Sequence, residues 1–150
     1  MQLSTPPFHP ARGFTAVFLA WFLCQLFKAS QGVLTKKRFD FRWLFDTGGM
    51  PSSHSATVSS LATTVGLYYS FSSVPFLITL VFAIITMFDA AGVRRSAGRQ
   101  ARILNRMLDD LYEKGQVPEE RLKELLGHTP FEVFTGAFVG FMISLLVCSA

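Results

Sequence analysis

Charged residues are scarce in this sequence, and cysteine is scarcer still. Lys, Arg, Asp and Glu make up 16% of the 150 residues, against 50% for the hydrophobic types, and the mean hydropathy is +0.37. Soluble domains ordinarily carry about 25% charged residues. The sequence contains no repeat, low-complexity tract or long polar domain. This composition disfavours a soluble globular protein and indicates a single membrane-embedded domain over residues 1–150.

The two cysteines give little support for a metal site. Cys24 and Cys148 both lie inside apolar runs, and neither has a partner at the spacing of a metal ligand. We therefore expect two buried free thiols.

Four apolar stretches approach the roughly 20 residues that a helix needs to cross a bilayer. They cover about residues 13–34, 55–73, 74–93 and 131–149, and the middle two form a hairpin around SFSSVP. Within the first stretch, the apolar run from Gly13 to Phe27 is followed by Lys28, Gln31 and Lys36–Arg38 where a signal peptide would have a small-residue cleavage site, so we expect a retained helix. The predicted fold is an all-α integral membrane bundle of about four transmembrane helices, in a bacterial inner membrane or its equivalent.

The distribution of basic residues predicts the orientation of the bundle. The connection between the first two spans carries four Lys or Arg residues and that between the last two carries eight, so together they hold twelve of the fourteen in the chain. The SFSSVP turn has none. Because cytoplasmic connections are enriched in Lys and Arg, we expect both basic connections on the cytoplasmic side and both termini on the other.

The connection from about 94 to 128 has a helical pattern of its own. Its apolar residues recur at helical spacing and its charged residues fall largely elsewhere, which predicts an amphipathic helix at the membrane surface that Gly115 ends. A second short helix, PEERLKELL, is expected from Pro118 to Gly127. Arginines beyond Arg95 are explained at least as well by attraction to membrane phospholipid headgroups as by catalysis.

The segment GGMPSSHS, residues 48–55, places one histidine in a turn-forming cluster at the start of the second span. The predicted topology brings further polar residues to the same membrane depth. Ionisable groups are costly inside a membrane, so their convergence indicates a functional site. The residues expected there are Gln25, Lys28, Lys36 or Lys37, Ser52, Ser53, His54, Asp89, Arg94, Arg95, His128 and Glu132.

Phosphoryl transfer is the chemistry that these residue types favour. PSSH opens a helix, so its free backbone N–H groups and serine hydroxyls can hold an anion, and arginines supply further donors. Of two histidines, one can attack phosphorus and the other can protonate the departing alkoxide. Structural alternatives exist for both ends of this site. His54 can be a polar residue at a helix entrance, and TPFE is a capping box that alone explains Thr129 and Glu132.

Three blocks, GGMPSSHSATV, FDAAGVRRSAGRQARILN and ELLGHTPFEVFTGAFVGF, occur in this order. Over roughly residues 21–148 the chain resembles a divergent branch of the type 2 phosphatidic acid phosphatase and vanadium haloperoxidase superfamily. The resemblance implies that His54 is the general acid, that His128 is the nucleophile, and that Glu132 orients it.

The chain also departs from the superfamily pattern. In the parent pattern a phosphate-binding arginine lies six residues before the nucleophile, whereas here Arg95 lies 33 residues before His128. The role is therefore assigned to Arg94 or Arg95 from their predicted position at the site and not from a matching motif. The parent lysine block is absent, which leaves Lys28, Lys36 and Lys37 as candidates for that role.

The resemblance implies a phosphoric monoester hydrolase of phospholipid metabolism, with phosphatidylglycerol phosphate or phosphatidic acid as the leading substrates. Polyprenyl phosphates or diphosphates come next.

We expect no metal or other cofactor and no nucleic-acid partner. The competing interpretation is a non-catalytic protein that binds lipid phosphates or assists assembly. A homodimer is compatible with GAFVG at Gly136–Gly140, which permits close helix contact, although packing within one chain explains that motif equally well.

Overall fold

The computed structural model describes residues 9–36, 49–112 and 128–149, and nearly all of these are helical. No strand occurs in the described segments, so the predicted all-α class is confirmed. The helices are α1 (Pro10–Lys36), α2 (Ser53–Tyr69), α3 (Val74–Ala91), α4 (Val93–Tyr112) and α5 (Pro130–Ser149).

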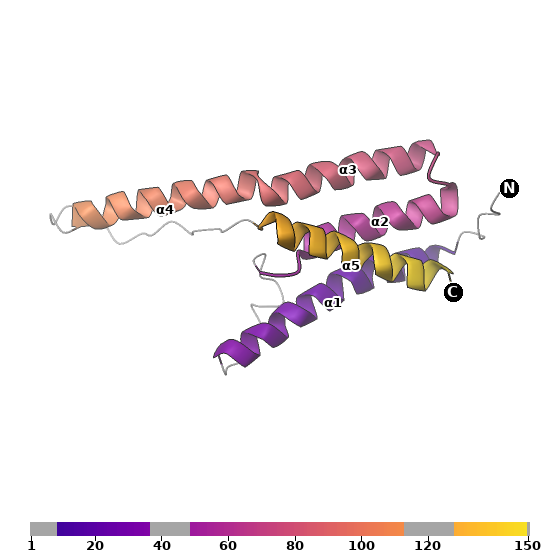
Figure 1. Cartoon of the computed structure of the whole chain (residues 1–150), viewed down its shortest axis with the longest axis horizontal. Helices are drawn as coiled ribbons and strands as arrows, with labels where there is room; N and C mark the ends of the chain where they lie inside the picture. The colour runs from indigo at the N-terminus through magenta and orange to yellow at the C-terminus, as the bar shows by residue number, and fades with distance from the viewer. Residues whose placement is uncertain (1–8, 37–48, 113–127, 150) are drawn as a thin grey trace.

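Helices α1, α2, α3 and α5 form a bundle in which α1 and α3 run in one direction and α2 and α5 run in the other (Figure 1). The start of α1, the end of α5 and the turn between α2 and α3 lie at one end. The end of α1, the start of α2, the end of α3 and the start of α5 lie at the other. Among the described residues, PSSH, Asp89, His128 and Glu132 therefore belong to the same end of the bundle.

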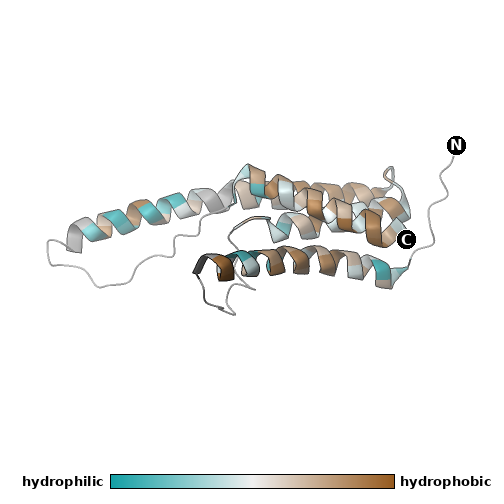
Figure 2. Ribbon diagram, turned by 60° about the horizontal axis from the view of Figure 1, so that its bottom comes forward, coloured by the Kyte–Doolittle hydropathy of each residue, from teal (hydrophilic) through white to brown (hydrophobic). Residues whose placement is uncertain are grey.

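The outer surface of the bundle suits a hydrocarbon solvent. Three stretches are long and apolar enough to cross a membrane, namely Pro10–Leu34, Val74–Asp109 and Pro130–Ser149. Large apolar side chains on α1, α3 and α5 point outward, and residues coloured as hydrophobic predominate along α3 and α5 in Figure 2. Phe14 is 78% exposed and Leu146 is 72% exposed. Such a surface is stable in a bilayer and costly in water, so the chain is an integral membrane protein.

Helix α2 differs from the apolar span that the sequence predicts. It is the shortest of the five helices at 17 residues, and it contacts α1, α3 and α5 at once. Three of its hydroxyl residues, Ser59, Ser60 and Thr64, bond to α5. The Ser60 hydroxyl lies 2.7 Å from the Ser144 hydroxyl, and the Ser59 hydroxyl donates to the Ala137 carbonyl at 2.8 Å. A Ser- and Thr-rich helix is stable here because neighbouring helices, rather than lipid, supply its partners.

Two glycines of α5 allow its backbone to touch that of α2. A Cβ atom added at Gly136 would overlap the Ser52 carbonyl oxygen, and one added at Gly140 would overlap the Ala56 carbonyl oxygen. The GAFVG motif, which the sequence left open between a homodimer and internal packing, thus makes a contact inside one chain.

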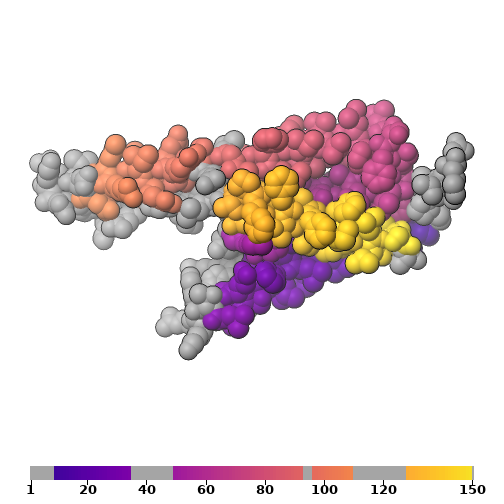
Figure 3. Space-filling model, in the orientation of Figure 1, coloured from indigo at the N-terminus to yellow at the C-terminus, as the bar shows by residue number. Residues whose placement is uncertain are grey.

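Helix α4 confirms the helix predicted after the third span. It begins directly after Gly92, whose N–H bonds to the Phe88 carbonyl at 2.8 Å and caps α3. It projects beyond the packed bundle (Figures 1 and 3), and α3 is the only described helix that it contacts. Its apolar face includes Leu104 and Met107, 47% and 56% exposed. A location at the membrane surface stays a prediction, and Gly115 and PEERLKELL lie outside the described residues.

The expectation for the cysteines is confirmed. Cys24 and Cys148 are free thiols, 1% and 2% exposed, and each belongs to an apolar cluster between helices.

The glycine contact predicts a large difference between two substitutions on α5. Gly140→Leu should destabilise the bundle by at least about 1–3 kcal/mol, because the new side chain must displace α2 backbone. Phe138→Leu introduces the same side chain at a position that is 63% exposed and should have little effect. Thermal unfolding of both variants in detergent measures the difference. Equal midpoints for the two variants would show that α5 does not depend on backbone contact at Gly140.

Candidate functional site

The PSSH block opens α2 as predicted. Ser52 is the N-cap, and its Oγ accepts hydrogen bonds from the Ser55 N–H at 3.4 Å and the Ser55 hydroxyl at 3.1 Å. Gly49 has φ of +84°, a conformation that favours glycine, just before this cap. Ser52 and Ser53 are both buried. The remaining N–H groups of the first turn thus lie at the end of the bundle where the polar clusters meet, which is favourable for an anion.

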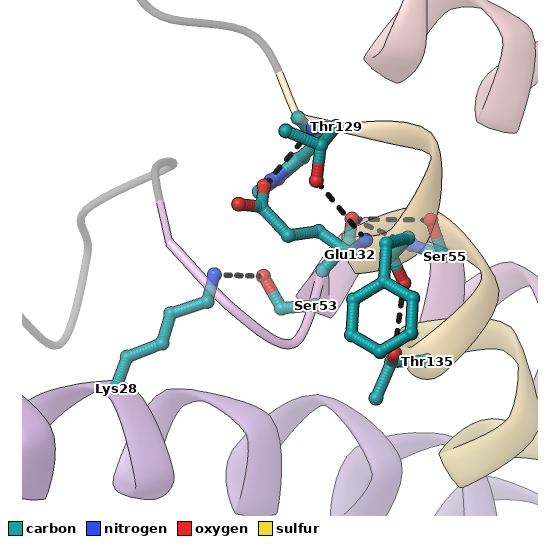
Figure 4. A network of polar contacts seen from close by, with 9 residues as sticks. Lys28, Ser53, Ser55, Thr129, Glu132 and Thr135 are labelled. Atoms are coloured by element: carbon teal, nitrogen blue, oxygen red, sulfur yellow. Dashed lines mark hydrogen bonds and ion pairs between the residues drawn. The ribbon is translucent and has the colours of Figure 1, made fainter.

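Lys28 of α1 reaches this block from the neighbouring helix. Its Nζ donates to Ser53 Oγ at 3.3 Å, although the side chain is only 8% exposed (Figure 4). Gln25 lies one turn earlier on α1 and is also buried. A buried ammonium beside a helix N-terminus concentrates positive potential, which is the electrostatic requirement for binding phosphate. Of the three lysines predicted for this role, Lys28 is therefore the one that the described structure places against PSSH.

His128 precedes α5 and is held by Glu132. The His128 Nδ1 and Glu132 Oε2 atoms are 3.0 Å apart, and the histidine is 2% exposed. A carboxylate accepts hydrogen bonds, so in this pair Nδ1 carries a proton, and in the neutral ring the lone pair is then on Nε2. Nε2 is buried and has no hydrogen-bond partner among the described residues. Because an unsatisfied buried nitrogen is costly, Nε2 is a candidate contact atom for a group outside the described residues.

Glu132 also completes the capping box that the sequence offered as an alternative. The same Oε2 accepts the Thr129 N–H at 3.2 Å, and Thr129 Oγ1 accepts the Glu132 N–H at 3.3 Å. Figure 4 shows this reciprocal pair at the first turn of α5. The capping role and the orienting role are therefore compatible, because one carboxylate oxygen bonds to both Thr129 and His128.

Backbone hydrogen bonds fix these elements against one another. The Ser52 N–H donates to the Glu132 carbonyl at 3.1 Å, which joins the start of α2 to the start of α5. The His128 N–H donates to the Ala90 carbonyl at 3.1 Å, which joins the residue before α5 to the end of α3. The convergence predicted for these three helix ends is thus present in the fold.

The remaining predicted residues either have a position in a helix or lie outside the described part of the structure. His54 is half-buried at the second position of α2. Asp89 is half-buried in the last turn of α3, where it lines an open hollow with Gly92 and Gln100. Arg94 and Arg95 belong to the first turn of α4, but their side chains, like that of Lys36, lie outside the described part of the structure, as does Lys37 entirely. Phosphate contacts from these four residues stay predictions.

Sequence reasoning missed two contributors to the site. Ser55 shares the capping interaction of Ser52, and the Ala90 carbonyl anchors His128. The serine had a visible signal, because hydroxyl residues recur at helical spacing from Ser52 through Thr64. The carbonyl had none, since a backbone contact between distant segments leaves no trace in residue types.

These groups belong to one end of the bundle and have the residue types that anion binding uses. Lys28 supplies positive charge, the start of α2 supplies N–H donors, and Glu132 fixes the tautomer of His128. Positive charge, N–H donors and an imidazole held by a carboxylate are the groups that nucleophilic attack on a phosphoryl group uses.

Comparison with known proteins places the chain in a family of membrane proteins. The chain is 40% identical over 134 residues to the uncharacterized membrane protein YuiD of Bacillus subtilis (strain 168), an alignment that covers 82% of this chain and 85% of the relative. No solved structure matches the chain. The model of the divergent PAP2 family matches residues 10–143, and this protein belongs to that family.

Proposed function

We propose that this membrane protein hydrolyses a lipid phosphate monoester through a phosphohistidine. The observation that carries the proposal is the state of His128, whose Nδ1 is fixed by Glu132 while its buried Nε2 has no partner among the described residues. Membership of the divergent PAP2 family supports the same class of chemistry.

The proposed reaction has two steps. In the first, Nε2 of His128 attacks phosphorus, an N–P bond forms, and the P–O bond to the lipid breaks while His54 donates a proton to the departing oxygen. In the second, water attacks the phosphohistidine, the N–P bond breaks, and the water proton passes to His54. Lys28, the first N–H groups of α2 and Arg94 or Arg95 would stabilise the charge on the phosphoryl oxygens.

The substrate class follows from where the site lies. It is at one end of a bundle whose outer surface suits lipid, so a phosphate at the bilayer surface can reach it while its tails remain in the membrane. Phosphatidylglycerol phosphate and phosphatidic acid have this arrangement, and a polyprenyl phosphate or diphosphate has it too.

A second function deserves comparison because the chain departs from the parent superfamily. The parent lysine block is missing and the arginine is displaced along the sequence, which also fits a protein that binds lipid phosphates without turning them over. Measuring phosphate released by the purified protein from a panel of lipid phosphates distinguishes the two. Saturable binding without release would favour the non-catalytic function.

The proposed roles predict different kinetics for variants at three residues. His128→Ala should lower kcat at least about 10³-fold on every substrate, because no nucleophile remains. His54→Ala should cost about 10²- to 10⁴-fold with a natural lipid but little with an aryl phosphate, whose leaving group needs no proton. Lys28→Met should reduce kcat/KM about 10²- to 10³-fold, and Lys28→Arg should restore part of the loss.

The chain provides a matched control for the histidine variants. His9, the third histidine, is exposed at the start of α1, at the opposite end of the bundle, so His9→Ala should retain wild-type rates. Near-normal phosphate release from a natural lipid by His128→Ala would refute the mechanism.

We further propose that the site faces the cytoplasm, because the two connections at its end of the bundle carry most of the basic residues. Single cysteines at Ser72 and Gln100, with Cys24 and Cys148 replaced, test this in intact cells. An impermeant thiol reagent should label the cysteine at Ser72 and spare that at Gln100. The reverse pattern would place the site outside and make polyprenyl phosphates the leading substrates.

A further inference from the structure

An apolar groove runs between α3 and α5 and has no role in the chemistry described above. Its volume is about 270 Å³, and every side chain that lines it is apolar. On each helix the lining residues follow i, i+3, i+4 spacing, so they form one continuous face of that helix. They are Ile84, Met87, Phe88 and Ala91 of α3 and Pro130, Val133 and Phe134 of α5.

One end of this groove borders the candidate site. Ala91 is adjacent to Ala90, whose carbonyl accepts the His128 N–H, and Pro130 is only two residues beyond His128. The other lining residues continue along both helices away from the site. A molecule in the groove would therefore have one end beside the imidazole and the rest within the membrane.

The exposure of the lining residues shows that the groove opens sideways. Phe88 and Phe134 are 75% and 74% exposed, whereas Val133 is 6% exposed. Two aromatic residues thus form an accessible rim and the valine forms part of the floor. Both helices belong to membrane-spanning stretches, so the rim faces hydrocarbon.

We propose that this groove binds the acyl chain of the lipid whose phosphate occupies the site, and so favours acylated phosphates over phosphates without a chain. The proposal rests on the proposed function. Water is a poor occupant, because a bound water needs two to four polar partners and the lining offers none. The groove is also smaller than the roughly 300–1,000 Å³ of sites that enclose a whole drug-sized ligand, which fits one segment of one chain. One end of the groove borders His128, so a lipid whose phosphate is bound at His128 has its acyl chain next to the groove. A bulk lipid has no such attachment, and we therefore infer that the occupant is the chain of the substrate.

Filling the groove tests the proposal. Met87→Trp should raise KM for dioleoyl phosphatidic acid roughly tenfold or more, because the indole occupies the volume of several methylene groups. It should leave hydrolysis of glycerol 3-phosphate unchanged, since that substrate has no chain. Ile78→Trp adds the same side chain to α3 at a position that is 64% exposed and absent from the lining, and it should change neither substrate. If Met87→Trp lowered kcat/KM equally for both substrates, or for neither, acyl-chain binding in the groove would be refuted.

Photocrosslinking provides a measurement that does not depend on turnover. Phosphatidic acid with a diazirine in its acyl chain should label wild-type peptides that contain residues 84–91 or 130–134, and Met87→Trp should reduce that labelling while Ile78→Trp should not. Labelling spread evenly over the exposed faces of α1 and α3 would mean contact with bulk lipid only, and would refute the proposal. Groove labelling in a wild-type protein that releases no phosphate from any lipid would instead support the groove and refute the proposed hydrolysis.

Discussion

The backbone of α5 lies directly against that of α2, since Gly136 and Gly140 present no side chain at the contact. Between helices in a membrane the hydrophobic effect provides little attraction, so close packing and hydrogen bonds must hold the bundle together. The glycine contact allows both. It brings the Ser144 hydroxyl to Ser60 in the middle of the helix pair, and it brings the Glu132 carbonyl within 3.1 Å of the Ser52 N–H at its end. The position of His128 relative to PSSH depends on this approach.

Burial sets the chemistry of the site. An ammonium or an imidazole removed from water must be compensated by neighbours. Lys28 has the Ser53 hydroxyl, and His128 has the Glu132 carboxylate on one ring nitrogen. The other ring nitrogen is not compensated within the described residues, and the start of α2 adds N–H donors nearby. A phosphate monoester would satisfy these groups together, because it supplies negative oxygens to the donors and an electrophilic phosphorus to the nitrogen.

The sequence predicted those features that depend on local patterns. Long apolar runs predicted α1, α3 and α5, and alternation of the spans predicted that His54, Asp89 and His128 would share one end of the bundle. TPFE predicted the capping box that Thr129 and Glu132 form at the start of α5. The central position of α2 was not predicted. Residues 55–73 carry no charge and so resemble an apolar span, but hydroxyl groups occupy the buried face of the helix. Nor could the sequence select Lys28 from three lysines or find the Ala90 contact, since both depend on how close separate helices lie.

The most direct test of the central claim is the position of phosphate on the trapped enzyme. After rapid mixing with a radiolabelled lipid phosphate and an alkaline quench, mass spectrometry and chromatography of the digest can identify the modified atom. Because Glu132 holds Nδ1, phosphate should be found on Nε2 of His128 in the wild-type protein. A Glu132→Ala variant that does not hydrolyse the lipid should carry no phosphate on His128. Phosphate on Nδ1 of His128, on His54, or on no histidine while lipid is being hydrolysed would contradict it.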